Sequence, residues 1–387
     1  MVNNQQSMTI LINSLGVQDS GGISVLDKVL SECARDKLNN YFIICGDNKN
    51  INELYNKYKN VDFFEFKMIK DRGAVFRLYY ENIVFRKHIK EEDIKLIYNF
   101  TGTTQFFIKS PPQLVKIHNI LFYSKKLNTF YYKKRLILKW CKDILVKRAV
   151  LVQMLNHATY LEIQSLHVKQ CLSDFINTRN KIFYVKSDID VSDKVFQIPR
   201  QYNFTKKIKF LYIVGPHFES LHKNFQDFTN AMVYLIEAGI NFEINITLTN
   251  GQLKNSKVWD ASLNSKTNFL GYISDQEKMT ELFCDNTILI STSFIETLGL
   301  HVIEGIKNGV ITISPDEDYS NSVYGDSMFT YELFNKNSLL DTITSIIDYK
   351  KPYDVRISSI QDDLKQSEMK KIGSILDVFN EVLNVQK

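Results

Sequence analysis

The stretch TILISTSFIETLGLHVIEGIKNGVITIS, residues 287–314, decides the fold class, because an apolar run passes through an amphipathic segment into a second apolar run. TILIST predicts a buried strand, residues 298–309 predict a helix, and VITIS predicts the next strand. Gly299 stands near the start of the predicted helix, and Gly309 stands at its end, where glycine commonly terminates a helix. The strand–helix–strand order predicts an α/β protein.

The same alternation continues on both sides of this stretch. Strand patterns cover residues 8–15, 41–46, 62–66, 95–100, 113–120, 207–215, 242–249 and 268–270, and helix patterns cover 25–37, 224–239 and 275–286. A chain of 387 residues exceeds the usual single core, and a second strand–helix series starts near Lys206. We therefore predict two α/β domains, 1–203 and 204–360, followed by a helical segment at 361–387.

The composition is that of an ordinary globular protein, with 44% hydrophobic and 24% charged residues. The first residues lack the basic flank and the long apolar run of a signal peptide, and no run approaches the ~18 apolar residues of a membrane-spanning helix. Five scattered cysteines without a CxxC pair indicate reduced thiols rather than disulfides or a zinc site. These features predict a cytoplasmic protein.

Basic residues concentrate between Ser124 and Arg148, where nine lysines and arginines accompany a single acid, Asp143. Apolar residues recur there at helical spacing. The combination fits a helix on an anionic membrane surface. The residues expected at the membrane are Lys133, Lys134, Arg135, Lys139 and Trp140. A helix packed on the domain core, with a solvated basic face, fits the same pattern. Nucleic-acid binding is less favoured, because no known binding motif accompanies the basic run.

Two glutamates bracket the start of the predicted helix. Glu296 lies in the loop at the carboxyl end of a strand, where open parallel sheets bind ligands. Glu304 lies about two turns further along the chain. Amides near Leu300 form an anion site at the helix end, and Gly299 lets a ligand approach the backbone. The arrangement suits a nucleotide-sugar, although a glutamate after a buried strand is commonly just a solvated residue.

The segment SFIETLGLHVIE, residues 293–304, resembles the EX7E signature of the retaining family 4 glycosyltransferases. The resemblance implies the GT-B fold, in which two Rossmann-like domains face each other across a cleft and a C-terminal helix crosses back to the first domain. It also implies transfer of a sugar from a UDP- or GDP-sugar to a hydroxyl of a glycan acceptor, with retained anomeric configuration and without a metal ion or other cofactor. Two DxD sequences, SDID and DEDY, are interpreted as incidental.

The resemblance also assigns roles to individual residues. Glu296 would bind hydroxyls of the donor sugar and Glu304 the ribose, with Thr297, Gly299 and Leu300 completing the donor site. Gly21 and Gly22, expected in the loop after the first strand, match a glycine pair beside the donor phosphates. Lys223, in GPHFESLHKNF, matches a lysine on the donor pyrophosphate, and His118, in KIHNILF, matches a histidine facing the donor sugar.

Two positions depart from the family pattern. Where relatives carry an arginine, this chain has Pro216 and His217, so either His217 or His222 takes its role, or the diphosphate has fewer donors. Relatives often have proline in the place of His301. The basic first domain fits an acceptor on a lipid diphosphate at the inner face of the cytoplasmic membrane, as in capsule or O-antigen assembly, while a soluble acceptor stays open. A GT-B nucleotide-sugar epimerase and a non-catalytic nucleotide-sugar-binding component are the alternative functions.

Overall fold

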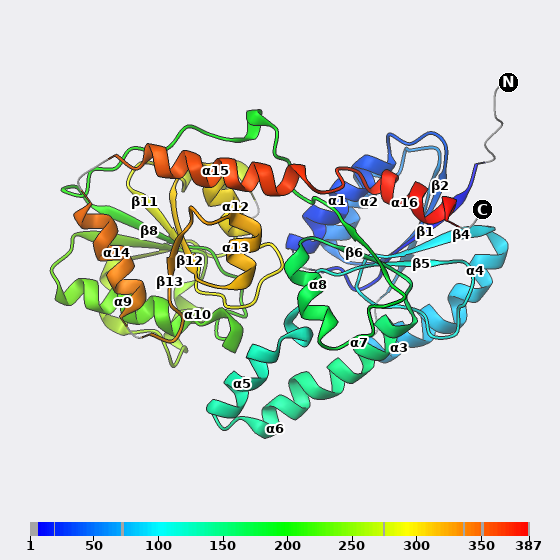
Figure 1. Cartoon of the computed structure of the whole chain (residues 1–387), viewed down its shortest axis with the longest axis horizontal. Coiled ribbons are helices and arrows are strands. Elements are labelled where there is room, and N and C mark those ends of the chain that lie inside the picture. Colours follow the sequence, from blue (N-terminus) through cyan, green and yellow to red (C-terminus); the bar gives the residue numbers. More distant parts are fainter. Residues whose placement is uncertain are drawn as a thin grey trace. The chain divides into compact units, whose positions relative to one another are not determined.

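The computed structural model describes residues 7–18, 20–70, 73–273, 275–335, 337–349 and 352–385. The chain divides into two compact units, each built around one parallel sheet (Figure 1). The first unit comprises Met1–Asp188 together with Lys371–Lys387, and the second comprises Ile189–Lys370. The segment 189–203 therefore groups with the second unit, where Arg200 N donates to Gly309 O at 2.8 Å.

The first unit holds seven parallel strands in the order β3-β2-β1-β4-β5-β6-β7. Their bounds are β1 Thr9–Ser14, β2 Asn40–Gly46, β3 Phe64–Ile69, β4 Ile94–Asn99, β5 Gln113–Lys116, β6 Tyr160–Ile163 and β7 Ile182–Val185. Successive side chains of β1 point to opposite faces: Ile10 and Ile12 enter one core cluster and Leu11 enters another. Helices therefore cover both faces, as the unbroken apolar runs of the strands predict.

The helices of the first unit connect these strands in chain order. They are α1 Ser20–Cys33, α2 Lys49–Tyr58, α3 Ala74–Tyr79, α4 Phe85–Glu91, α5 Lys125–Lys133, α6 Ile137–Trp140, α7 Val146–His157 and α8 Leu166–Ser173, with π-helical turns at Tyr80–Val84 and Cys141–Leu145. α16, Ile375–Asn384, also belongs to this unit and packs on α1 and β4, with the Phe379 ring 5.2 Å from Tyr98. A C-terminal helix does return to the first unit, as predicted, but the returning segment begins at Lys371 rather than at residue 361, because α15 ends at Met369 within the second unit.

The second unit holds six parallel strands in the order β10-β9-β8-β11-β12-β13. Their bounds are β8 Ile208–Tyr212, β9 Phe242–Ile246, β10 Thr267–Phe269, β11 Thr287–Ile290, β12 Ile311–Pro315 and β13 Phe329–Tyr331. The helices are α9 Phe225–Glu237, α10 Asn250–Lys254, α11 Gln276–Glu281, α12 Leu300–Lys307, α13 Asp318–Tyr324, α14 Ser338–Asp348 and α15 Asp354–Met369. No helix in the described part of the chain is long and apolar enough to cross a membrane.

Candidate functional site

In the second unit the strand order reverses between β8 and β11, which are hydrogen-bonded neighbours. Because both strands are parallel, the loops that follow them leave from the same edge of the sheet, which is where open α/β sheets bind ligands. The loop after β8 carries His217, His222 and Lys223, and the loop after β11 carries Glu296. Sequence positions about seventy residues apart are thereby brought to one place.

Lys223 and Glu296 form an ion pair, with Nζ 2.6 Å from Oε1. The backbones of the two loops are also tied together. Thr292 Oγ1 donates to Lys223 O at 2.7 Å, and Phe294 N donates to His222 O at 2.9 Å. The side chains of Lys223 and Glu296 remain 27% and 17% exposed, so that a ligand in solution can reach both. The structure thus brings together Lys223 and Glu296, which the family resemblance predicts as catalytic residues together with His118.

Glu296 is ionised at neutral pH. Burial alone would raise the pKa of the Glu296 carboxyl. The charge of Lys223, the neighbouring His301 and the hydrogen bonds that the carboxylate accepts outweigh burial and lower the pKa to about 2. His301 lies on α12, and its Nε2 atom is 3.0 Å from Ser291 Oγ. Burial lowers the pKa of His301 to about 4 and so keeps the ring neutral. The site therefore carries one cation and one anion at neutral pH.

The loop before α12 has a fixed conformation. Gly299 has φ of 61°, in the left-handed region that favours glycine, and a Cβ atom there would lie 2.2 Å from the hydroxyl of Tyr324. That hydroxyl donates to Leu298 O at 2.8 Å, and the hydroxyl of Tyr319 donates to Ser293 O at 2.6 Å. Both tyrosines belong to α13, which no pattern in the sequence connects with the site. Two buried phenols thus hold the loop that carries Glu296.

The beginning of α12 offers backbone donors beside Glu296. The first intrahelical bond runs from Val302 N to Gly299 O at 2.8 Å, so that the amides before it have no partner within the helix. Such amides, together with the helix dipole, form an anion site. Thr297, Leu300 and Glu304 are partly exposed around this helix end. Burial raises the pKa of Glu304, and Lys307 opposes that effect.

The two candidate histidines of the β8 loop differ in their surroundings. His217 is exposed and accepts through its carbonyl from Ser220 N at 3.0 Å, in a turn. His222 is partly buried. Its burial and the charge of Lys223 lower its pKa to about 4, against the opposing effect of Glu296. His222 therefore borders the ion pair as a neutral ring, and His217 lies in a solvent-exposed turn.

Gly21 and Gly22 lie in the first turn of α1, which begins at Ser20, so their predicted placement in a loop is wrong. The turn after β1 is shorter than expected, because Val17 N already bonds Ser14 O at 3.2 Å. A Cβ atom at Gly22 would meet only Val17, at 3.4 Å, which is an ordinary contact. Sterics therefore do not explain the second glycine.

His118 follows β5, as predicted. Its ring packs against Phe100 with centroids 4.4 Å apart, and its Nε2 atom bonds the Phe100 carbonyl. Burial and the neighbouring Lys116 lower its pKa to about 4, so the ring is neutral.

The SDID sequence has a structural explanation. The side chain of Asp188 is fully buried, with its carboxylate 2.7 Å from Lys116 Nζ and 3.3 Å from Lys186 Nζ, and it accepts from Gln164 Nε2 at 2.6 Å. The interpretation of SDID as incidental missed this ion cluster, which an isolated sequence pattern cannot reveal. Among the described residues, no group of three or more histidine, cysteine or acidic side chains could hold a metal ion.

The basic segment is not the single predicted helix: it comprises α5, then α6, the π-helical turn Cys141–Leu145 and the first residues of α7. α5 ends at Lys133, and Arg135, with φ of 55°, separates it from α6. Lys133, Lys134, Arg135 and Lys139 are exposed, as is Leu138 at 88%. Trp140 is partly exposed and contacts α5: its indole donates to Asn128 Oδ1 at 2.9 Å, and its ring lies 5.4 Å from the exposed ring of Tyr132. Arg148 is buried and also donates to Asn128 Oδ1, at 2.8 Å.

No protein-family model matches the sequence, and no curated protein matches it significantly. Solved structures do resemble the fold over nearly its whole length. HepE of Anabaena, crystallised with UDP and glucose, matches with a TM-score of 0.65 at 12% identity, covering 98% of this chain and 99% of that one. The lipopolysaccharide outer core galactosyltransferase WaaB, in its apo form, matches with a TM-score of 0.64 at 12% identity, covering 98% and 100%.

Sucrose-phosphate synthase of Thermosynechococcus elongatus matches with a TM-score of 0.63 at 12% identity, covering 98% of this chain and 97% of that one. These likenesses span both units and agree with the two parallel Rossmann-like sheets. The chain therefore has the predicted GT-B fold.

Proposed function

We propose that this chain transfers a sugar from a UDP- or GDP-sugar to a hydroxyl of a glycan acceptor, with retention of the anomeric configuration and without a metal ion. The observation that carries the proposal is the Lys223–Glu296 pair, 2.6 Å apart, beside the first turn of α12 and at the reversal point of the second sheet. The names of similar structures support it, because they include a galactosyltransferase and a protein crystallised with UDP and glucose.

Lys223 and the amides of α12 would bind the donor diphosphate. Breaking the glycosidic bond moves negative charge onto the leaving nucleoside diphosphate, and preorganised donors stabilise that charge most when water is excluded. Lys223 also donates to Glu296. A donor phosphate would therefore share the ammonium with a carboxylate that stays ionised, because its pKa is about 2.

Glu296 would accept hydrogen bonds from hydroxyls of the donor sugar, and Glu304 would accept them from the ribose. The rings of His222 and His301, which lie in the same unit as Lys223, are neutral and would add no further positive charge beside the phosphates. We assign no protein nucleophile. The oxocarbenium-like transition state would be met on the same face by the acceptor hydroxyl, whose proton passes to the departing phosphate.

The acceptor would be lipid-linked at the inner face of the cytoplasmic membrane, in the assembly of a surface polysaccharide such as capsule or O-antigen. Exposed Lys133, Lys134, Arg135 and Lys139 flank the exposed apolar side chains of Ile137 and Leu138 along the chain. Basic and apolar side chains in one exposed patch suit anionic headgroups and the acyl boundary. Trp140 is omitted from this surface, because its indole already has a partner within the protein.

The proposal is tested by release of nucleoside diphosphate from a panel of UDP- and GDP-sugars, with membrane extract as the acceptor. Wild-type protein should release diphosphate and form an α-linked product from an α-linked donor. Glu296→Ala should abolish release, whereas Glu277→Ala, on exposed α11, should not. Epimerisation of the donor without acceptor would identify an epimerase instead, and donor binding without either reaction would identify a binding component.

A further inference from the structure

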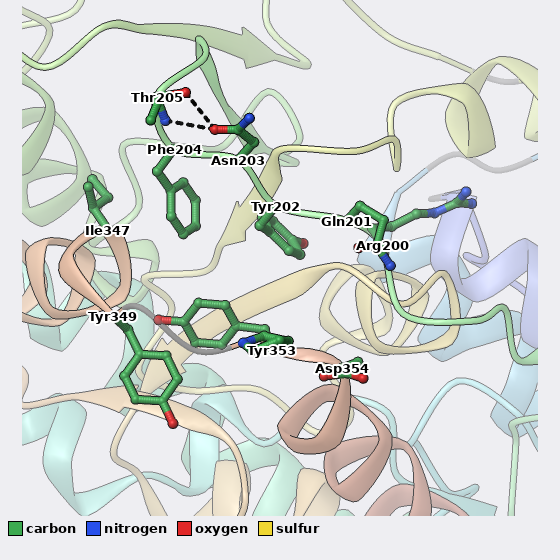
Figure 2. A pocket seen from close by; sticks show the side chains of 11 residues that line it. Arg200, Gln201, Tyr202, Asn203, Phe204, Thr205, Ile347, Tyr349, Tyr353 and Asp354 are labelled. Atoms are coloured by element: carbon green, nitrogen blue, oxygen red, sulfur yellow. Dashed lines mark hydrogen bonds between the residues drawn. The ribbon is translucent and has the colours of Figure 1, made fainter.

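A groove of about 820 Å³ lies in the second unit between the segment that leads into β8 and the segment that leads into α15 (Figure 2). Four aromatic side chains line it: Tyr202, Phe204, Tyr349 and Tyr353. The volume falls within the range of small-molecule binding sites. None of these residues belongs to the proposed donor site.

The groove lies at the amino-terminal edge of the second sheet. The hydroxyl of Tyr202 donates to Thr287 O at 2.8 Å and accepts from Ile311 N at 2.6 Å. Thr287 and Ile311 are the first residues of β11 and β12. Glu296 instead follows the carboxyl end of β11, so the length of that strand, about 10 Å, separates the two edges. A ligand of the groove would not compete with a donor held by Lys223.

Two of the four aromatic side chains are held in place by hydrogen bonds of their hydroxyls. Tyr202 is anchored through its hydroxyl, and the hydroxyl of Tyr353 donates to Ile346 O at 2.7 Å. Ring centroids of Tyr202 and Phe204 lie 5.6 Å apart at 37°, and those of Phe204 and Tyr353 lie 6.3 Å apart at 71°. Because these rings are tilted, they do not form the parallel walls that would clamp a flat nucleobase. They offer apolar faces to a ligand that is itself not planar.

Polar groups with unused hydrogen-bonding capacity border these rings. Asn203 Oδ1 accepts from Thr205 N at 3.1 Å and Thr205 Oγ1 at 2.6 Å, which leaves the Asn203 amide nitrogen to donate elsewhere. Among the described residues, the side chains of Gln201 and Asp354 also have no hydrogen-bonding partner. Amide and carboxylate groups beside aromatic faces are a suitable combination for a polyhydroxylated ring, which has apolar C–H faces and hydroxyl edges.

The charges that the structure describes around the groove favour an uncharged ligand over a phosphate. Arg200 is directed away from the rings in Figure 2, and its Nε atom donates to Asn308 O at 3.1 Å. Asp354 lies in the first turn of α15, where its carboxylate meets the positive end of the helix dipole. A phosphate would be repelled by that carboxylate, whereas sugar hydroxyls would donate to it.

We propose that this groove binds a segment of an uncharged oligosaccharide, with pyranose faces against Tyr349 and Phe204 and hydroxyls on Gln201, Asn203 and Asp354. The groove would retain a growing glycan at a distance from the reacting end, a role that rests on the proposed function. The binding itself does not, because neither the donor nor turnover is needed for it.

The test is ligand-observed NMR and calorimetry with the full chain and a panel of uncharged trisaccharides of glucose, galactose, mannose and N-acetylglucosamine. At least one should bind. Its Kd should rise tenfold or more in Tyr349→Ala and severalfold in Gln201→Ala. Both side chains are exposed, so the fold should persist. The matched control, Tyr272→Ala, removes an exposed tyrosine elsewhere in the second unit and should leave the Kd unchanged.

Three results would overturn the assignment: no trisaccharide binds at millimolar concentration, Tyr349→Ala binds as tightly as wild type, or UDP displaces the trisaccharide. Binding of inorganic phosphate in place of sugars would also contradict it. If trisaccharides bind but no donor sugar is transferred, the proposed function fails and the groove stands. If transfer occurs without trisaccharide binding, only the groove assignment fails.

Discussion

Replacing Gly299 with alanine should destabilise the second unit by about 2–5 kcal/mol. Two effects add. Holding an alanine at φ of 61°, in the left-handed conformation, costs roughly 1–2 kcal/mol. Its Cβ would also lie 2.2 Å from the Tyr324 hydroxyl, which must move and lose its bond to Leu298 O, at a cost of about 1–3 kcal/mol for a buried group.

The steric part can be isolated by a double-mutant cycle with Tyr324→Phe. Without the hydroxyl, the nearest atom of residue 324 is Cζ at 3.5 Å, an ordinary contact. In the Tyr324→Phe background, Gly299→Ala should therefore cost only the roughly 1–2 kcal/mol of conformational strain. The two substitutions should thus be less than additive.

Urea unfolding followed by tryptophan fluorescence measures both costs. The chain has two tryptophans, Trp140 in the first unit and Trp259 in the second, so a Trp140→Phe background makes Trp259 the sole reporter of the second unit. Equal costs of Gly299→Ala with and without the Tyr324→Phe substitution would refute the proposed contact. A cost below about 1 kcal/mol would refute the left-handed conformation as well.

Three further predictions concern charge. Lys223→Met should destabilise the protein most above pH 5, and the difference in stability from wild type should shrink as the pH falls from 4.5 towards 2. The reason is that the Lys223–Glu296 pair stabilises the fold only while the Glu296 carboxylate, with its lowered pKa, is ionised. Thermal melts at several pH values measure this difference. As the pH falls from 6.5 to 4, wild type should lose more stability than His301→Gln in the same melts. In this range the unfolded chain binds a proton at His301, whereas the folded chain does not, because its His301 has a pKa of about 4. Reversing Lys133, Lys134 and Arg135 to glutamate should weaken binding to anionic vesicles at least about a hundredfold, because losing each basic residue costs roughly 1 kcal/mol and the glutamates add repulsion. Reversing exposed Lys254, Lys257 and Lys278 should not weaken binding, and sedimentation with vesicles measures both.

Strand and helix patterns predicted much of the fold, because both sheets are parallel and their central strands are unbroken apolar runs. β11, α12 and β12 lie within a few residues of their predicted bounds. The missed strands are short and carry weak signals. β6, at Tyr160–Ile163, contains Glu162, which is buried against Lys116, and a charge inside a strand hides its apolar pattern. Only the tertiary partner makes Glu162 a core residue.

The candidate site was predicted only in part, because some of its contacts depend on tertiary partners that the sequence does not reveal. The resemblance to the family 4 glycosyltransferases identified Glu296 and Lys223, and the structure shows that the two side chains form an ion pair. The support provided by Tyr319 and Tyr324 could not be predicted, because both reach the loop from a helix that follows β12 and act through single hydroxyls. The helical break at Arg135 was missed because the basic and apolar pattern continues across it, while the backbone there adopts φ of 55°.

Calorimetric titration with UDP and GDP most directly tests whether the Lys223–Glu296 pair and the start of α12 bind a nucleoside diphosphate. One of the two nucleotides should bind wild type, and its Kd should rise at least tenfold in Lys223→Met. Lys209→Met removes a partly buried lysine of the same unit, beside Cys284, and should bind as wild type does. Equal affinity of Lys223→Met and wild type, or weakening of equal size in Lys209→Met, would contradict the account.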